Sequence, residues 1–409
     1  MNTPQVDVAQ LQNRDPDAWS RLLREVLATD DVAVTAVTAE PLRTAQNAPY
    51  DHPVSRYHIT LAEHTDPITF IGKHTNLAEI QFYQKWSHDF PDLAAPCHYL
   101  YAHERGGWLI LEDIPDDFPP LKWTPQHAEH LIEQLADLHT LYWQNPEALS
   151  RLALPHFIGG QQTTWEDLVE SQPVYFEQGP GAILSEHAIH HVGGLAETFL
   201  KAANGLLVMR SLEGWPGILG ESHLTAVADL LDDPVPMLEP LKNLPLTLVH
   251  GNPHSHHWRL TLFEESYLLD WHQAIIGPSV LDLVSFTEQF DLLFENGNQS
   301  RLLVRQERPL SDETMIDSYL LTMSTRLGTK FDGRAVRRAI PAARCLHVLT
   351  HWLPHFATWF AQMPNKYTWQ KINRLTDEQI AETPYRAMIP FRPYLAGVFH
   401  RFLQSYKTL

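Results

Sequence analysis

The stretch 246–283 places two short apolar runs close together, each followed by polar side chains. The first run, Leu246–Val249, has the length and composition of a buried strand, and the turn His250-Gly251 follows it. The second run, Tyr267–Leu269, ends on Asp270. Because sites in mixed α and β proteins tend to form in concave places at strand ends, we expect one site here. Its candidate residues are Asn252, His254, His257 and Asp270.

The stretch also resembles a known motif. The aminoglycoside phosphotransferase and choline kinase group, whose fold is similar to protein kinases, carries H-G-D-x-H-x-x-N, then D-W or D-F, then G and D-L. The resemblance implies an α+β chain with a two-lobed, protein-kinase-like fold. A small antiparallel-sheet lobe would span residues 1–114, and a larger, mainly helical lobe would span 115–409 with a catalytic-loop-like segment at 246–283. The matching residues are His250, Gly251, His254, Asp270, Trp271, Gly277, Asp282 and Leu283.

Two positions of the motif differ in this chain. Asn252 stands where the family has its catalytic aspartate, and a neutral amide can orient a hydroxyl but cannot take its proton. His254, His256 and Glu264 are the other candidates for a base, and the sequence does not choose among them. His257 stands where the family has its metal-binding asparagine. Since imidazole suits Zn²⁺ or Mn²⁺ better than Mg²⁺, three alternatives stay open: Mg²⁺ on Asp270 and water, another metal, or no metal.

A lysine near the N-terminal end completes the predicted nucleotide site. The segment 67–73 has a strand pattern and ends on Lys73, and Asn76 after it can cap a helix. The resemblance implies that Glu79 pairs with Lys73 and that Lys73 meets Asp270 at one bound triphosphate. The alternative is that Glu79 only caps its helix.

The resemblance also implies where ATP would contact backbone. The strand WLILED leads into a hinge at Glu112 and Ile114, which we predict to meet the adenine. In kinase-like folds a glycine-rich hairpin covers the phosphates, yet this chain has no glycine between Asp31 and Ile71. The hairpin therefore either approaches the phosphates less closely or does not cradle them.

Periodicity predicts the remaining elements. We expect one helix over 7–28, strands over 31–42 and 55–63, and a hairpin around Gly106-Gly107. Helices are predicted from Thr124, over 186–208 and 222–243, over 284–297 and from Ser311. A long apolar helical segment over 334–360 should be interrupted by Pro341 and Pro354, and His139 should be a satisfied packing residue. The region 155–243 matches no motif.

Composition narrows the classes of partner. The net charge of −19 over 409 residues makes the chain a poor partner for nucleic acid or anionic lipid. With only two cysteines, no long apolar run and no signal-peptide pattern, the sequence predicts a cytoplasmic protein without a membrane segment. It leaves the oligomeric state open.

Two main hypotheses follow. The first is an ATP-dependent small-molecule kinase that uses Mg²⁺ or Mn²⁺ to phosphorylate a substrate hydroxyl, at a rate reduced by Asn252. The second is a pseudokinase that binds a nucleotide or ligand without phosphate transfer. A third, weaker hypothesis is another ATP-using transfer, such as nucleotidylation. The acceptor cannot be named from the sequence.

Overall fold

The computed structural model describes residues 6–43, 53–63, 66–159, 168, 184–263, 265–290, 293–296, 301–304, 309–360, 363, 365–383, 385–386 and 391–409. The chain forms two compact units. The first contains 1–122, 146–154 and 256–274, and the second contains 123–145, 155–255 and 275–409. The stretch 246–283 is therefore shared between the units, and the lobes at 1–114 and 115–409 stay a prediction.

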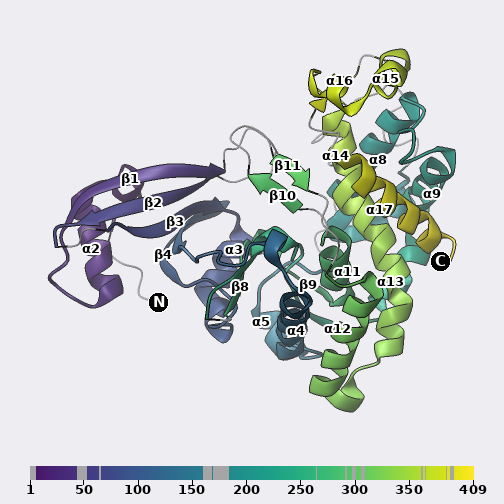
Figure 1. The fold of residues 1–409 in the computed structure, drawn as a ribbon. Coiled ribbons are helices and arrows are strands. Elements are labelled where there is room, and N and C mark those ends of the chain that lie inside the picture. The colour runs from purple at the N-terminus through teal and green to yellow at the C-terminus, as the bar shows by residue number, and fades with distance from the viewer. Residues whose placement is uncertain are drawn as a thin grey trace. The chain divides into compact units, whose positions relative to one another are not determined.

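The first unit contains a five-stranded sheet in the order β1-β2-β3-β5-β4, with every neighbouring pair antiparallel (Figure 1). Tyr57, Ile59 and Leu61 alternate toward the core, which is the period expected of a half-buried strand. The predicted N-terminal antiparallel sheet is confirmed. Its strands are β1 (Val34–Arg43), β2 (Val54–Leu61), β3 (Ile68–Thr75), β4 (Cys97–His103) and β5 (Gly106–Glu112).

The helix predicted over 7–28 is wrong, because the structure has two helices there. These are α1 (Val8–Gln12) and α2 (Pro16–Leu27). Proline disfavours helical backbone in the residue before it, and Asp15 is accordingly extended and accepts a hydrogen bond from the Asp17 N–H at 3.0 Å. On α2, the fully buried Trp19 packs against Tyr57 of the sheet with ring centroids 5.2 Å apart.

The first unit also contains short helices and a second strand pair. Helix α3 (Leu77–Gln81) continues into a π-helical turn, Phe82–Trp86. Helix α5 spans Pro146–Arg151, and the short strands β7 (Trp258–Leu260) and β8 (Ser266–Leu268) pair antiparallel.

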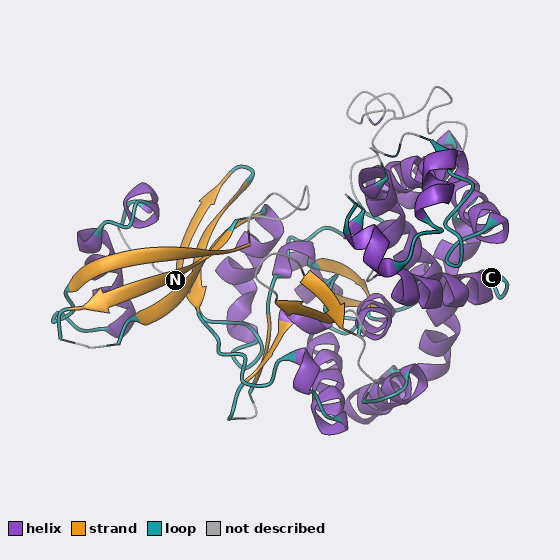
Figure 2. Ribbon diagram, turned by 45° about the horizontal axis from the view of Figure 1, so that its top comes forward, coloured by secondary structure: helices purple, strands orange, loops and turns teal. Residues whose placement is uncertain are grey.

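The second unit is mainly helical (Figure 2), so the α+β class is confirmed. Its strand pairs, β6 (Leu246–Val249) with β9 (Ile275–Pro278) and β10 (Leu293–Asn296) with β11 (Arg301–Val304), are antiparallel. Its helices are α4 (Pro125–Leu141), α7 (Glu186–Val192), α8 (Ala196–Ser211), α9 (Glu221–Asp232), α10 (Val235–Lys242), α11 (Val280–Gln289), α12 (Asp312–Leu327), α13 (Gly333–His347), α14 (Leu353–Trp359), α15 (Lys366–Ile372), α16 (Asp377–Ala381) and α17 (Phe391–Tyr406).

Local capping signals locate two of these helices. The Thr124 and Ser311 hydroxyls accept backbone hydrogen bonds at the starts of α4 and α12, as predicted. The segments 186–208 and 222–243 are helical but divided. Gly193, at a φ of +52°, ends α7, and Pro234 precedes α10.

The helix predicted over 284–297 is wrong in its second half. Helix α11 ends at Gln289, and Leu293–Asn296 is strand β10. A short apolar run does not distinguish helix from strand, whereas Asn296-Gly297 between two runs is a hairpin signal that favours strands.

Pro341 lies inside α13 and does not interrupt it, while Pro354 lies in the first turn of α14, after a π-helical turn at Val348–Trp352. Within the described segments, no helix has the length and apolar character needed to cross a bilayer.

The half-buried His347 is expected to make the second unit sensitive to acid. The Nε2 atom of His347 is buried, and burial lowers the pKa of His347 to about 4, with Glu288 raising it and Arg401 lowering it. The unfolded ring has a pKa of about 6.5. Between these values the unfolded state binds more protons, so stability falls as pH falls.

We therefore expect His347→Gln to reduce the loss of stability between pH 7 and pH 5. Over this range the free energy of unfolding should fall by about 2 kcal/mol more in the wild type than in the variant. Each pH unit below 6.5 contributes roughly 1.4 kcal/mol of this difference. Urea unfolding at the two pH values measures it. His187→Gln, at an exposed position on α7, is the control and should behave as wild type. Equal losses of stability in wild type and His347→Gln would contradict the assignment of the acid sensitivity to His347.

Candidate functional site

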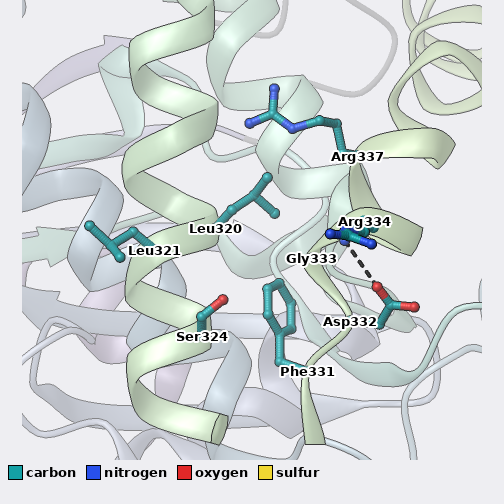
Figure 3. Close-up of a pocket in the computed structure, with 8 residues that line it drawn as sticks. All are labelled: Leu320, Leu321, Ser324, Phe331, Asp332, Gly333, Arg334 and Arg337. Atoms are coloured by element: carbon teal, nitrogen blue, oxygen red, sulfur yellow. Dashed lines mark hydrogen bonds between the residues drawn. The ribbon is translucent and has the colours of Figure 1, made fainter. Parts of the chain in front are cut away.

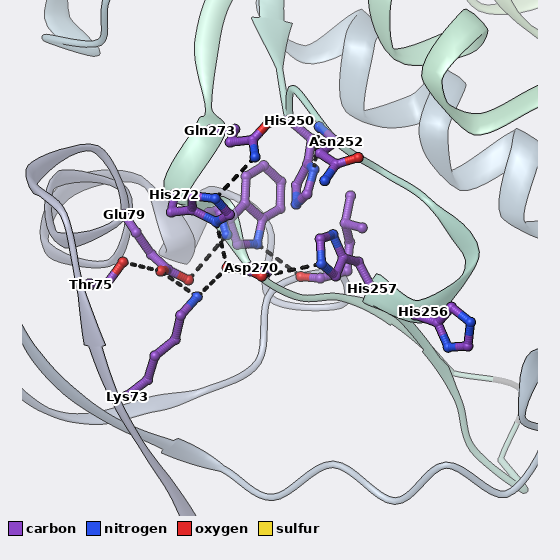
Figure 4. Close-up of polar contacts among 12 residues, drawn as sticks. Lys73, Thr75, Glu79, His250, Asn252, His256, His257, Asp270, His272 and Gln273 are labelled. Atoms are coloured by element: carbon purple, nitrogen blue, oxygen red, sulfur yellow. Dashed lines mark hydrogen bonds and ion pairs between the residues drawn. The ribbon is translucent and has the colours of Figure 1, made fainter. Parts of the chain in front are cut away.

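Lys73 is held near the end of strand β3, between two acidic side chains. Its register is fixed on both sides, opposite Val54 of β2 and Leu109 of β5. The side chain is buried, with the residue 6 % exposed, and its Nζ atom lies 2.6 Å from Glu79 Oε2. Lys73 also forms an ion pair with Asp270 (Figure 4). The sequence predicted the Lys73–Glu79 pair, and the structure contains it.

Glu79 is fully buried on α3. Asn76 caps this helix by accepting the Glu79 N–H at 3.2 Å, and its amide donates to the His272 carbonyl oxygen at 2.8 Å. The Glu79 carboxylate itself accepts the Thr75 hydroxyl at 2.5 Å and the Trp271 N–H at 3.1 Å. Glu79 therefore does more than begin its helix, because its carboxylate binds Lys73 and the residue that follows Asp270.

Asp270 follows β8 in a left-handed backbone conformation, with φ of +73°, which aspartate tolerates better than most residues. Its Oδ1 atom accepts Lys73 and the His272 Nδ1–H, the latter at 2.6 Å. Its Oδ2 atom lies 3.2 Å from His257 Nε2 (Figure 4). Since an ionised carboxylate has about four acceptor positions and donates nothing, these three contacts use most of its capacity.

Opposite charges stabilise the ionised forms of Lys73 and Asp270. Burial alone would raise the pKa of Asp270, but the charges of Lys73 and His257 and the histidine hydrogen bonds hold it well below its usual value. Burial alone would lower the pKa of Lys73, but Asp270 and Glu79 outweigh burial and raise it. Counted without the histidines, Lys73, Glu79 and Asp270 leave one net negative charge.

Aromatic packing fixes the turn that carries Asp270. Trp271 is fully buried and stacks on Phe82, with ring centroids 3.9 Å apart and planes 9° from parallel. Its indole N–H donates to the Leu268 carbonyl oxygen at 2.8 Å. Such close stacking of buried rings restricts the backbone that carries Asp270.

Glu112 and Ile114 lie at and just beyond the end of β5. Glu112 is exposed, and its carboxylate lies 2.6 Å from His98 Nε2. The Glu112 backbone N–H already donates to the Pro96 carbonyl oxygen at 2.9 Å. Ile114 is half-buried. Their contact with an adenine remains a prediction.

In the second unit, Asn252 belongs to a tightly bonded turn after β6. Its N–H donates to His250 Nδ1 at 3.2 Å, and its Oδ1 atom accepts the Gln289 amide at 3.0 Å. His254 is half-buried, and its N–H donates to the Asn252 carbonyl oxygen at 2.9 Å. Asn252 and His254 therefore share one turn, while their catalytic roles stay a prediction. Glu264, the third candidate base, lies outside the described residues.

Asp282 holds this turn from helix α11. It is fully buried, and its two oxygens accept the N–H groups of His250 at 2.7 Å and Gly251 at 2.8 Å. His139 Nε2 lies 3.2 Å from the same carboxylate, and His139 Nδ1 lies 2.7 Å from the Tyr319 hydroxyl. Because the carboxylate only accepts, the ring donates to Asp282 and accepts from Tyr319. The prediction that His139 is a satisfied packing residue is confirmed.

The sequence did not identify His272 and Gln289. His272 contacts Asp270 from two residues away, and its position directly after Trp271 was a signal that could have found it. Gln289 reaches Asn252 across the fold of the second unit, and no local pattern marks it.

A surface hollow of about 460 Å³ lies between α12 and the start of α13 (Figure 3). Leu320, Leu321 and Phe331 form its apolar part, and Arg337 at its edge pairs with Glu313 at 3.1 Å. As far as the chain is described, none of the predicted site residues lines it. We therefore place the candidate site elsewhere, at Lys73, Glu79, His257 and Asp270.

No protein-family model and no curated protein sequence matches the chain. Solved structures of small-molecule kinases align with most of it. A choline kinase from Cryptosporidium parvum is 11 % identical, with a TM-score of 0.42 over 91 % of this chain and 89 % of that one. A choline kinase from Streptococcus pneumoniae is 11 % identical (TM-score 0.40; 96 % and 99 % covered), as is an aminoglycoside phosphotransferase from Alicyclobacillus acidocaldarius (TM-score 0.40; 90 % and 91 % covered). Since these scores are low, the proposals below rest on the residues of this chain.

Proposed function

We propose that this protein binds ATP at Lys73, Glu79 and Asp270 and transfers its terminal phosphate to the hydroxyl of a small molecule, at a reduced rate. One observation carries the proposal. The Lys73 ammonium is buried between two carboxylates that come from α3 and from the turn after β8. Because isolated charges are costly to bury, a buried lysine held in this way suggests a prepared binding group rather than a surface charge.

The proposed roles follow from charge and donor type. Glu79 orients Lys73 toward phosphate oxygens, and Asp270 supplies an oxygen ligand for a divalent ion. Glu112 and Ile114 are proposed to meet the adenine. Phosphate transfer depends mainly on positioning and on neutralising charge, so Asn252, whose amide is held by Gln289 at 3.0 Å, can orient an acceptor hydroxyl without removing its proton. His254 is the neighbouring candidate for that proton.

A second candidate is a pseudokinase that binds nucleotide without transfer. Two observations favour it: the amide of Asn252 in place of a carboxylate, and the nitrogen of His257 at 3.2 Å from Asp270. Both candidates require nucleotide binding at Lys73, and they differ in turnover. Measurable phosphate transfer to any hydroxyl acceptor would exclude the pseudokinase.

Nucleotide binding is tested by thermal unfolding of the full chain with ATP and either Mg²⁺ or Mn²⁺. A ligand at 100 times its Kd stabilises the folded state by about 2.7 kcal/mol, so the midpoint should rise. Lys73→Met should abolish the rise. Lys85→Met, at an exposed lysine of the same unit, should keep it. If ATP stabilises neither the wild type nor Lys85→Met with any metal, the proposed function is wrong.

A further inference from the structure

Asp270 and His257 bring a carboxylate oxygen and a ring nitrogen together in the buried part of the site. Asp270 Oδ2 and His257 Nε2 are 3.2 Å apart, and both residues are at most 8 % exposed. The other carboxylate oxygen, Oδ1, is held by Lys73 and His272. Oδ2 is therefore the oxygen that faces His257, and the turn fixes which side of Asp270 an ion would meet.

The separation fits one shared ion. Adjacent ligands of an octahedral ion with bonds of about 2.1 Å lie roughly 3.0 Å apart. The pair thus needs little movement to bind an ion in place of its present contact. Within the described residues, no group of three or more His, Cys, Asp or Glu side chains is arranged to hold a metal. The protein would supply two ligands, and the remaining positions suit phosphate oxygens and water.

Charge also favours a divalent ion here. Counted without the histidines, Lys73, Glu79 and Asp270 carry one net negative charge, which repels a triphosphate. A divalent ion on Asp270 reverses the sign of the group to one net positive charge. Triphosphate and metal are therefore expected to bind together, and the identity of the metal depends on His257.

We infer that the ion that accompanies ATP is a first-row transition-metal ion such as Mn²⁺, bound by Asp270 Oδ2 and His257 Nε2, rather than Mg²⁺; this rests on the proposed function. Mg²⁺ strongly prefers oxygen ligands, whereas imidazole belongs to the ligands of first-row transition metals. For Nε2 to bind the ion, the single proton of the neutral His257 ring must be on Nδ1.

Calorimetric titration of ATP into the full chain, with Mn²⁺ and with Mg²⁺, tests the inference. Wild type should bind ATP about tenfold more tightly with Mn²⁺ than with Mg²⁺. Changes to the groups around a metal ligand alter metal affinity by about 10- to 100-fold, and we expect the low end of that range. His257→Asn supplies an amide oxygen and should remove this preference. His272→Asn is the matched control, because His272 contacts the other oxygen of the same carboxylate. It should weaken binding with both ions alike and keep the ratio.

A spectroscopic measurement separates ligation from a structural effect. In electron paramagnetic resonance of Mn²⁺ with inorganic triphosphate, whose donors are all oxygen, any directly bound nitrogen comes from the protein. Wild type and His272→Asn should show nitrogen coupling, and His257→Asn should not. Tight ATP binding with equal affinity for both ions, or without nitrogen coupling, overturns the inference and leaves the proposed function standing. No ATP binding with either ion overturns both.

Discussion

Asn252→Asp is expected to raise the rate of ATP-dependent phosphate transfer by about 10² to 10⁴, the usual contribution of a general base. The turn can accept the change. Asn252 Oδ1 receives the Gln289 amide at 3.0 Å, and a carboxylate oxygen can receive the same bond. The backbone N–H of residue 252 would keep its bond to His250. Release of phosphate from ATP, with water or a panel of small hydroxyl compounds as acceptors, measures the rate.

The control for this change is Asn243→Asp, at an exposed asparagine of the same unit. It adds the same charge away from the turn and should leave the rate at the wild-type value. A rate for Asn252→Asp that stays at the wild-type level, in a variant that still binds ATP, would contradict the attenuated kinase. That outcome would favour the pseudokinase.

Glu288→Ala is expected to lower the free energy of unfolding by about 3–5 kcal/mol, the cost of breaking a buried ion pair from one side. Glu288 on α11 is 2 % exposed. Its carboxylate pairs with Arg401 of α17, at 2.6 Å from Nη2, and with Arg344 of α13, at 2.9 Å from Nε. The Tyr394 hydroxyl also donates to its carbonyl oxygen at 2.7 Å. Without the carboxylate, two half-buried arginines would lie beside each other, with Asp312 as a more distant partner at 3.8 and 3.9 Å.

Urea unfolding of the full chain measures the loss, and an exposed pair provides the comparison. Asp137 accepts two hydrogen bonds from Arg326, at 2.7 and 3.1 Å, on the surface of the same unit. Asp137→Ala should lower stability by about 1 kcal/mol or less, because solvent screens exposed pairs. Equal losses for Asp137→Ala and Glu288→Ala would contradict the role assigned to the buried carboxylate.

Local signals in the sequence were sufficient for several elements of the site. The strand pattern of β3 and the helix cap at Asn76 placed Lys73 on a strand and Glu79 at a helix start, whereas their pairing was predicted from the family resemblance. Thr124 and Ser311 located helix starts for the same reason. Side chains that bond to backbone within three residues leave a pattern that can be read directly.

Contacts that cross the fold left no such pattern. Gln289 orients Asn252 from helix α11, and Glu288 meets arginines of two helices far along the chain.

The predicted N-terminal helix was divided by a local signal, because Pro16 disfavours helical backbone at Asp15 and this outweighed the apolar spacing around it. Strand β10 differs from the predicted helix because pairing with β11 decides the conformation of an ambiguous apolar run.

The central claim is that Lys73, Glu79 and Asp270 form the group that receives the triphosphate. A crystal structure of the full chain with a non-hydrolysable ATP analogue and Mn²⁺ tests it most directly, because anomalous scattering locates the metal independently of the side chains. We expect phosphate oxygens bonded to the Lys73 ammonium and a Mn²⁺ peak between Asp270 Oδ2 and His257 Nε2. Nucleotide bound elsewhere, with the Lys73–Asp270 ion pair unchanged, would contradict it.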